Sequence, residues 1–468
     1  MRSSIVLNAD SARNTFSIQA CRFMELTEDY VQQGVNPGGY YKAVWCRDAS
    51  YILRDWFLSG RMEDVMQEVM FLWSHQITQT SEKLVYGRGS PEMKYLSHIA
   101  KPEVQEKFDG AMPTTIFHGF SEVYSQNPDI DSTALMISAT SWILNAYLKA
   151  GLFLPPPPSS SLLSSVEQEL DKRISSVVSD PSVVINFAIP RMLKAVDYLV
   201  SRDIDGDGLL EQGYNEDWMD TVLRAGKIVY SQACWILALN NLSELLSELG
   251  NREEVDRIMT LANNTIDAVE RYLWSEEDYS YIDVQETHHI GGGPYKTLTQ
   301  DVSLYIVAIT ENMRIQDMLD VQLKSSRKGR MIKHDQIARA ASTLDTIKTR
   351  IWKNKWPLVT EAELKTTGPW KLHPNQYHNH TFWPWTTGIE MQARSRLSRF
   401  EECDLLMSTL LRGNNSSNDL LAFYEWINPV TGKGDGAFPF RTGISTIRIA
   451  ITDILSTMQH NTSRISSQ

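Results

Sequence analysis

The feature that most restricts the fold is the repeated three- and four-residue spacing of apolar side chains. Segments with this spacing form α-helices that present an apolar face to a neighbour. Alternating strand patterns and two-residue hairpin turns are scarce by comparison. The sequence therefore predicts an all-α chain of roughly a dozen helices. The segments expected to be helical are 48–58, 61–77, 132–152, 183–201, 228–248, 252–273, 298–310, 313–351 (at least two helices), 388–411 and 443–459.

The length of the chain, 468 residues, fits one large domain or roughly two to three ordinary ones. Its composition, 42% hydrophobic and 22% charged, is sufficient for a large core. A proline run, Pro155 to Pro158, followed by serines, predicts a surface loop near residues 154–165. Because helices of the same character resume after it, we predict a single domain over residues 1–468 with this loop inserted.

Charge and cysteine usage exclude several classes of partner. The formal net charge of −12 argues against nucleic acid or an anionic membrane. No apolar run is long enough to span a bilayer, and no cleavable signal pattern opens the chain. The four scattered cysteines form no C-x-x-C pair, which argues against a zinc knuckle and suits a reducing cytoplasm. Glycine-rich nucleotide-binding loops are absent from the sequence, so no cofactor is expected. The sequence does not fix an oligomeric state.

Two acidic clusters about two hundred positions apart carry the chemistry. The first holds Glu216, Asp217 and Asp220 around Trp218, and the second places Glu425 beside Tyr424. Two carboxylates on opposite sides of a sugar ring are the minimum for hydrolysing a glycosidic bond. Aromatic rings suit the apolar faces of that sugar. The alternatives are a solvated turn for the first cluster and a buried, backbone-bonded glutamate for the second.

A third motif places Arg47 and Asp48 directly after Trp45. A guanidinium fork beside a carboxylate can bind two neighbouring hydroxyls of a pyranose. The alternative is an ion pair at the start of a helix.

Trp383 and Trp385 end a segment that also contains three histidines, His373, His378 and His380. Histidines this close suggest a metal site, but neither a nearby cysteine nor a His-Glu-x-x-His helix supports one. We therefore predict no metal, and interpret the segment as a wall of a sugar-binding cleft.

Alternating aspartates from Asp203 to Asp207, followed by Glu211, resemble a calcium loop. The segment lacks the full twelve-residue pattern. A tight Asp-Gly turn is the favoured interpretation, and calcium binding stays open.

The order of these motifs resembles that of the (α/α)6-barrel glycoside hydrolases, the superfamily of glucoamylases, debranching-type glucosidases, trehalases, alkaline invertases and mannosylglycerate hydrolases. The similarity extends from about Gly38 to Leu455. It implies a toroid of six inner and six outer helices with long active-site loops on one face.

The resemblance also implies residue roles. Arg47 and Asp48 would bind the sugar before the cleaved bond, Asp220 would be the general acid, and Glu425 the general base. Glucoamylases carry the acid one position earlier, where this chain has Met219. This departure favours the debranching or invertase side and leaves Asp217 as a second candidate for the acid. The remaining substrate-binding candidates are Trp45, Glu216, Trp218, Trp383, Trp385 and Tyr424.

The expected activity is exo-acting, inverting hydrolysis of a terminal α-glucosidic bond in a small oligosaccharide or a glucan end. Inversion implies a carboxylate separation of about 6.5–9.5 Å. Trehalose, sucrose and mannosylglycerate remain alternative substrates. Two hypotheses of another class are a sugar epimerase that uses histidines such as His288, His289, His378 or His380, and a sugar-binding toroid without catalysis.

Overall fold

A computed structural model provides the structure of the protein. It describes residues 2–31, 33–81, 83–150, 181–285, 295–323, 330–353, 356–361, 372–414 and 419–466. The loop expected near residues 154–165 lies outside these ranges, as do His288 and His289 of the epimerase hypothesis.

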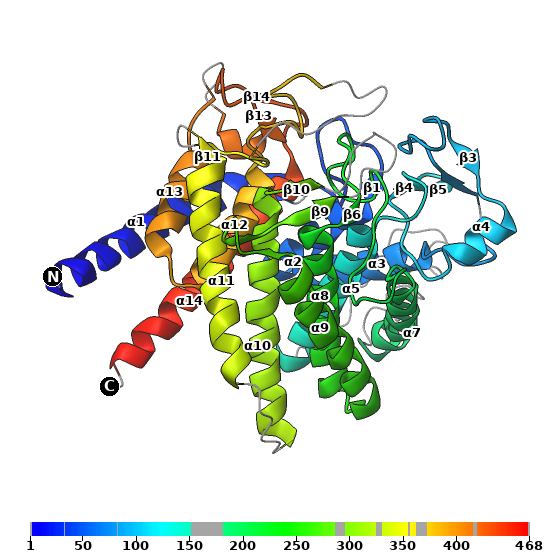
Figure 1. Cartoon of the computed structure of the whole chain (residues 1–468), viewed down its shortest axis with the longest axis horizontal. Coiled ribbons are helices and arrows are strands. Elements are labelled where there is room, and N and C mark those ends of the chain that lie inside the picture. Colours follow the sequence, from blue (N-terminus) through cyan, green and yellow to red (C-terminus); the bar gives the residue numbers. More distant parts are fainter. Residues whose placement is uncertain are drawn as a thin grey trace, which may run out of the picture.

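Six helices, each labelled in Figure 1, contact one another in a closed ring. Each contacts the next in the order α2, α5, α8, α10, α12, α14, and α14 returns to α2. The inner helices are α2 (Cys46–Leu58), α5 (Ile130–Ala150), α8 (Val229–Glu248), α10 (Ser303–Leu323), α12 (Pro384–Arg396) and α14 (Arg441–Ser466).

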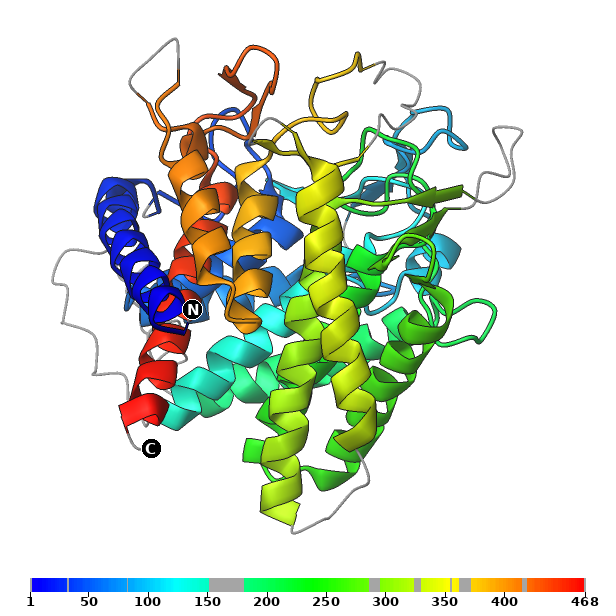
Figure 2. The same cartoon turned by 60° about the vertical axis from the view of Figure 1, so that its left-hand side comes forward.

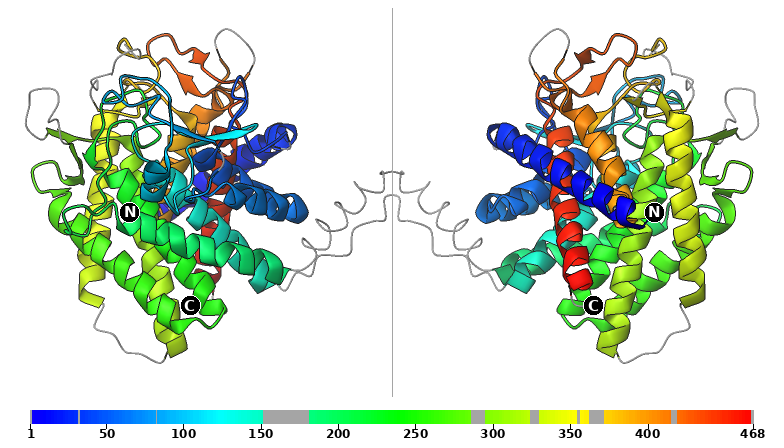
Figure 3. Two further views of the ribbon diagram at one scale, coloured as in Figure 1. Left: turned by 90° about the vertical axis from the view of Figure 1, so that its right-hand side faces the viewer. Right: turned by 90° about the vertical axis from the view of Figure 1, so that its left-hand side faces the viewer.

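The outer helices alternate with the inner ones along the chain and pack around them. They are α1 (Arg2–Val31), α3 (Met62–Ser74), α7 (Pro181–Val200), α9 (Arg252–Tyr272), α11 (Arg330–Thr346) and α13 (Phe400–Leu410). A short helix, α4 (Pro102–Lys107), lies in a loop region. The described residues thus form six inner and six outer helices, which confirms the expected toroid. The terminal helices α1 and α14 lie side by side (Figure 3).

Inner and outer helices differ in how they are buried. Every residue of α8 from Val229 to Leu246 is buried, so this helix is covered on all sides, as a helix in the centre of a toroid must be. The outer helix α9 buries one face, and its N-cap Asn251 accepts a hydrogen bond from the Glu254 amide. The sequence pattern therefore identifies an inner helix such as α8 because it is buried on all sides, and an outer helix such as α9 because it buries one face.

The long loops gather at one end of the toroid, above the N-termini of the inner helices (Figure 2). Short strands of two to four residues brace them. One sheet has the order β1-β4-β5-β2-β3, and another has the order β10-β9-β6. The strands of these two sheets are β1 (Val44–Trp45), β2 (Leu84–Tyr86), β3 (His98–Ile99), β4 (Thr115–Phe117), β5 (Phe120–Val123), β6 (Gly226–Lys227), β9 (Asp283–Gln285) and β10 (Tyr295–Thr297).

Three further antiparallel pairs brace other loops. They are β7 (Trp274–Ser275) with β8 (Ser280–Tyr281), β11 (Trp352–Lys353) with β12 (Trp356–Pro357), and β13 (Trp426–Ile427) with β14 (Gly434–Asp435). Single helical turns occur at η1 (Gln300–Val302), η2 (Ile347–Ile351) and η3 (Leu421–Phe423).

The helices differ from expectation in three places. The segment 388–411 is two helices, because Ser398 has a left-handed φ of 58° at the turn between α12 and α13. Helix α10 runs on past residue 310 to Leu323. Helix α1 was not predicted, because its buried apolar stripe is narrow and includes Phe16, Ala20 and Phe23.

Cys21 is exposed and the other three cysteines are buried, all with free thiols. In the described part of the chain, we find no helix with the length and apolar character needed to cross a bilayer.

Candidate active site

A cleft opens among the loops at the N-terminal ends of the inner helices. Its empty volume, counted with the open solvent inside it, is about 420 Å³, which is within the size range of small-molecule sites. The lining combines aromatic rings with charged side chains. It consists of Pro37, Tyr41, Trp45, Arg47, Asp48, Trp218, Asp220, Tyr377, His378, Trp383, Trp385, Glu425, Phe440 and Thr442.

Strand β1 and the first turn of α2 deliver Trp45, Arg47 and Asp48 to this cleft. Trp45 is held by pairing with Thr115 in β4. Asp48 accepts hydrogen bonds from Thr442 Oγ1 at 2.6 Å and from Arg47 Nη2 at 3.0 Å. The other guanidinium nitrogen, Arg47 Nη1, lies 3.6 Å from Asp131 but has no hydrogen-bond partner among the described residues. Arg47 is thus fixed by two carboxylates and keeps one donor for a ligand.

Asp220 projects into the cleft from the loop before α8. Its side chain is 15% exposed, and His378 Nδ1 lies 3.9 Å from Asp220 Oδ1. Burial raises the pKa of Asp220 to about 7, and the charges of Asp217 and Glu425 act in the same direction. Arg47 opposes this shift. A carboxyl in this state can still hold its proton near neutrality.

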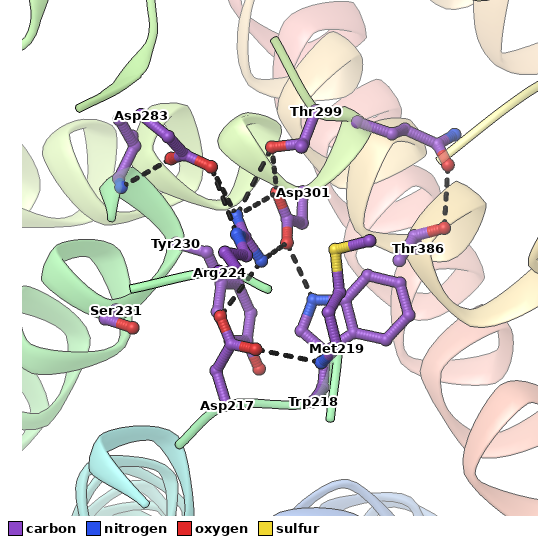
Figure 4. A network of polar contacts seen from close by, with 12 residues as sticks. Asp217, Trp218, Met219, Arg224, Tyr230, Ser231, Asp283, Thr299, Asp301 and Thr386 are labelled. Atoms are coloured by element: carbon purple, nitrogen blue, oxygen red, sulfur yellow. Dashed lines mark hydrogen bonds and ion pairs between the residues drawn. The ribbon is translucent and has the colours of Figure 1, made fainter. Parts of the chain in front are cut away.

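The loop that carries Asp220 is anchored by Arg224, which is buried among three carboxylates (Figure 4). Arg224 donates to Asp217 at 3.0 Å, to Asp283 at 2.8 Å and to Asp301 at 2.8 Å. Asp217 in turn accepts from the Met219 amide at 2.9 Å. Asp301 accepts from Trp218 Nε1 at 2.6 Å. These bonds fix both residues that separate Asp217 from Asp220, so the network sets the position of Asp220.

Glu425 lies in the cleft directly before β13 and is 1% exposed. Four donors saturate its oxygens. Tyr41 and Tyr377 donate to Oε1 at 2.6 and 2.9 Å, and Tyr40 and the Ala437 amide donate to Oε2 at 3.0 and 2.7 Å. Burial raises the pKa of Glu425, while these hydrogen bonds to the carboxylate oppose the shift. The donors orient the group and favour its ionised form.

Tryptophans build the floor and one wall. Trp218 contacts Trp385 and Trp383 edge to face, with ring centroids 4.8 and 5.4 Å apart. His378 stacks on Trp383 at 4.8 Å, and its Nδ1 lies 2.9 Å from the Thr221 hydroxyl. Burial lowers the pKa of His378 well below its usual value, so the ring is neutral. The cleft therefore presents rigid apolar surface beside its charged groups.

Comparison with known proteins gives matches only at the level of structure. No family model matches the sequence, and no curated protein does. A glucoamylase from Saccharomycopsis fibuligera matches with a TM-score of 0.57 and 12% identity, over 95% of this chain and 96% of the other. A GH63 mannosylglycerate hydrolase from Thermus thermophilus, in complex with glucose, matches with a TM-score of 0.53 and 15% identity, over 94% and 99%. An uncharacterized conserved protein of the same organism has a TM-score of 0.55 and 15% identity, over 91% and 99%. This chain has the (α/α)6-toroid fold.

Within the toroid, eight of the eleven residues predicted for the site line the cleft: Trp45, Arg47, Asp48, Trp218, Asp220, Trp383, Trp385 and Glu425. They come from four segments that are far apart in the sequence. Their convergence brings carboxyl groups, a guanidinium group and aromatic rings into one cleft.

Three predicted substrate-binding residues lie outside the lining. Glu216 is buried, pairs with Arg202 at 2.8 Å and accepts from Asn127 at 2.7 Å. Asp217 is buried against Arg224. The ring of Tyr424 packs on Phe438 with centroids 4.7 Å apart. In each case a protein partner occupies the group, so these positions fit support of the loops better than contact with a ligand.

Tyr40, Tyr41 and Tyr377 were not predicted as site residues from the sequence, and for the hydrolase His378 was placed only within the segment interpreted as a wall of the cleft. Tyr377 adopts a left-handed φ of 48°, uncommon for a bulky side chain. Only the folded loops bring these tyrosines to Glu425.

The acidic turn at Asp203, Asp205, Asp207 and Glu211 gathers four carboxylates within 4.8 Å of one another. Lys227 lies among them, at 2.7 Å from Asp205, 2.5 Å from Asp207 and 3.4 Å from Glu211. One ammonium group therefore offsets part of the negative charge of this turn.

Proposed function

We propose that this toroid is a glycoside hydrolase that removes a terminal sugar with inversion at the anomeric carbon. The observation that carries the proposal is the meeting of Asp220 and Glu425 in one cleft, with different environments. Asp220 lies in a desolvated position where its pKa is about 7. Glu425 is held by four donors that favour its charge. When the environments of two carboxyls favour opposite protonation states, the protonated one can act as the acid and the ionised one as the base.

In the proposed reaction, protonated Asp220 gives its proton to the glycosidic oxygen as the bond to the anomeric carbon breaks. Ionised Glu425 takes a proton from the water that attacks the opposite face. Water must reach a carboxylate whose four acceptor positions are already occupied. Tyr40 is 59% exposed, so its hydroxyl is the donor that water displaces most easily. Proton exchange with solvent then restores both groups.

In this proposal, Arg47 and the aromatic walls of the cleft bind the substrate. Arg47 Nη1, a buried donor without a hydrogen-bond partner in the described residues, can bind a ring hydroxyl. Trp45 and Trp385 present apolar surface to the sugar faces. The rest of the Arg47–Asp48 pair is already bonded within the protein, so Asp48 acts by orienting Arg47.

We propose a terminal α-glucosidic bond as the substrate linkage, in the sense of glucoamylase or amylo-1,6-glucosidase. Mannosylglycerate is the second candidate, because the mannosylglycerate hydrolase structure matches this chain over 94% of its length and 99% of its own. Trehalose and sucrose complete the set.

The test is release of reducing sugar from maltose, isomaltose, panose, maltodextrins, mannosylglycerate, trehalose and sucrose. Proton NMR during the first minutes reports the anomer of the product. Release from one substrate with the inverted anomer first is the expected result. A retained anomer contradicts inversion, and release from none contradicts the hydrolase proposal.

The same assay separates the two other classes. An epimerase converts sugars without releasing a new reducing end, and it needs a titrating acid and base. Burial lowers the pKa of His378 and keeps its ring neutral. The second histidine, His380, has its Nδ1 at 2.9 Å from the Thr360 carbonyl oxygen. A binding toroid without catalysis predicts sugar binding with no turnover.

The pH dependence of kcat/KM is expected to be bell-shaped. Asp220 must be protonated, so activity falls as pH rises through its pKa of about 7. Glu425 must be ionised, so activity falls as pH drops through a pKa raised above the usual range for glutamate. Tyr377→Phe removes a donor to the ionised form and should move the acidic limb upward while the alkaline limb stays in place. If kcat/KM does not change between about pH 6 and about pH 9, this assignment of acid and base is wrong.

Gly436 offers a test of the position of Glu425. A Cβ there would lie within 2.4 Å of Glu425 Oε2, and the residue has a left-handed φ of +78°. Gly436→Ala should therefore displace the carboxylate and lower kcat by about 100-fold. Gly250→Ala is the matched control, because Gly250 has φ +76° and no atom within 4 Å of its Cβ. Similar kcat values in the two variants would contradict a role for the position of Glu425.

A further inference from the structure

A second cavity, the distal cavity, lies at the other end of the inner ring. Its empty volume, counted in the same way, is about 960 Å³, larger than that of the cleft. All six inner helices line it. Along α2 its lining begins with Tyr51 and Arg54, beyond Arg47 of the cleft, and along α14 it includes Asp453, eleven positions after Thr442 (453 − 442). It therefore lies farther from the N-terminal ends of α2 and α14 than the cleft does.

An aromatic layer separates the two spaces. Tyr51, which lines the distal cavity, packs edge to face against Trp385, which lines the cleft, with centroids 5.9 Å apart. Both rings are buried. At its other end, the cavity is lined by Leu58, which is 41% exposed, and by the exposed Ser456. A ligand would thus enter from the face of the toroid opposite the cleft.

The polar atoms around the distal cavity are unbalanced. Arg54 Nε and Arg396 Nε are buried donors with no hydrogen-bond partner in the described residues, and the Tyr51 hydroxyl, which can donate or accept, has none either. Asp453 Oδ2 is the unpartnered atom of the lining that can only accept. A buried donor without an acceptor is costly. What the cavity lacks is therefore acceptors.

The lining holds two cations, Arg54 and Arg396, and two carboxylates, Glu311 and Asp453, and both carboxylates pair with arginines other than Arg54. Arg396 already pairs with Asp453 at 3.1 Å and with Glu311 at 3.8 Å, and Glu311 also binds Arg314 at 2.7 Å. Arg54 has no ion pair within the described ranges, and its guanidinium lies 4.9 Å from the centre of the Trp142 ring. Burial lowers the pKa of Arg54, and the charges of Asp453 and Glu311 only partly oppose this shift.

The uncharged side chains of the lining indicate what the ligand carries besides its charged group. Gln392 is 8% exposed and contributes an amide to the lining, and Ser456 adds a hydroxyl. Trp142 offers a flat ring face next to Arg54. Amide and hydroxyl groups beside an aromatic face suit a carbon skeleton that bears hydroxyls.

We propose that the distal cavity binds a small polyhydroxylated anion, such as a sugar acid or a sugar phosphate, with its charged group on Arg54. This site is separate from the cleft and does not depend on the hydrolase proposal. Binding can therefore be measured whether or not the chain turns over a glycoside.

The experiment is isothermal titration calorimetry of the full chain with D-gluconate, glucose 6-phosphate, glucose and inorganic phosphate. Saturable binding of gluconate or glucose 6-phosphate at one site, weakened about tenfold or more by Arg54→Met, is the expected result. Arg47→Met, which removes the guanidinium of the cleft, should bind these anions as wild type does, which assigns the site to the distal cavity and not to the cleft. Arg61→Met is the matched control, because Arg61 also lies over a tryptophan, Trp56, at 3.7 Å, but lines neither space.

Two further variants protect the test against misfolding. Tyr51→Phe removes one unpartnered hydroxyl, and Arg54→Lys keeps the charge without the fork, so each should weaken binding less than Arg54→Met. Circular dichroism confirms that each variant is folded. No binding of either organic anion, or binding unchanged in Arg54→Met, overturns the proposal. Equal affinity for inorganic phosphate overturns the assignment to a polyhydroxylated ligand.

Discussion

Asp220→Asn is expected to lower kcat by about 100- to 10,000-fold, the usual contribution of a positioned general acid. An amide cannot supply the proton that the leaving oxygen needs, whereas its shape preserves the packing around Trp218. Glu425→Gln should cause a loss of similar size, because the amide cannot accept the proton from the attacking water. Both losses are measured as initial rates on the substrate that the release assay identifies.

A substrate with a better leaving group distinguishes the role of the acid from that of the base. A nitrophenyl glycoside leaves without protonation, so Asp220→Asn should recover most of its rate on that substrate, while Glu425→Gln should not. Asp345→Asn is the control for the same chemical change, because Asp345 is 66% exposed on α11 and pairs with Arg399 at 2.6 Å. Equal recovery of both cleft variants would reverse or remove the assignment of acid and base.

Arg224→Met is expected to lower the free energy of unfolding by about 3–5 kcal/mol. The substitution leaves Asp217, Asp283 and Asp301 buried without their shared cation. Removing one partner of a buried ion cluster is costly because the remaining charges have lost their water as well. Arg224→Lys keeps the charge but cannot reach three carboxylates with a fork, so an intermediate loss is expected. Urea unfolding, followed by tryptophan fluorescence, measures the change.

Arg257→Met provides the comparison for this prediction. Its ion pair with Asp197 is 3.3 Å long, and the two side chains are 38% and 70% exposed, so a loss of at most about 1 kcal/mol is expected. If Arg224→Met costs no more than this control, the Arg224 network does not hold the loop. The folded fraction of Arg224→Met should also turn over more slowly, because Trp218 and Met219 lose the bonds that place Asp220.

The helical framework could be predicted because each helix has its own apolar pattern. Helices such as α8 and α9 were visible within single segments of sequence. Helix α1 was not, since its buried stripe is narrow, and the break between α12 and α13 depends on the backbone of one residue, Ser398. The short strands gave no alternation because they have two to four residues.

The helical class, the alternation of apolar segments and the acid-bearing motifs follow from the sequence alone, since these depend on neighbours in the chain. Tertiary structure decided which acids share a cleft. Asp217 and Asp220 are three positions apart, yet one is bonded to Arg224 and the other faces the cleft. Glu425 meets Tyr40, Tyr41 and Tyr377 only through loop packing. The distal cavity is likewise invisible in the sequence, because its walls come from six helices. A side chain's burial and partners set its pKa, and both are properties of the fold.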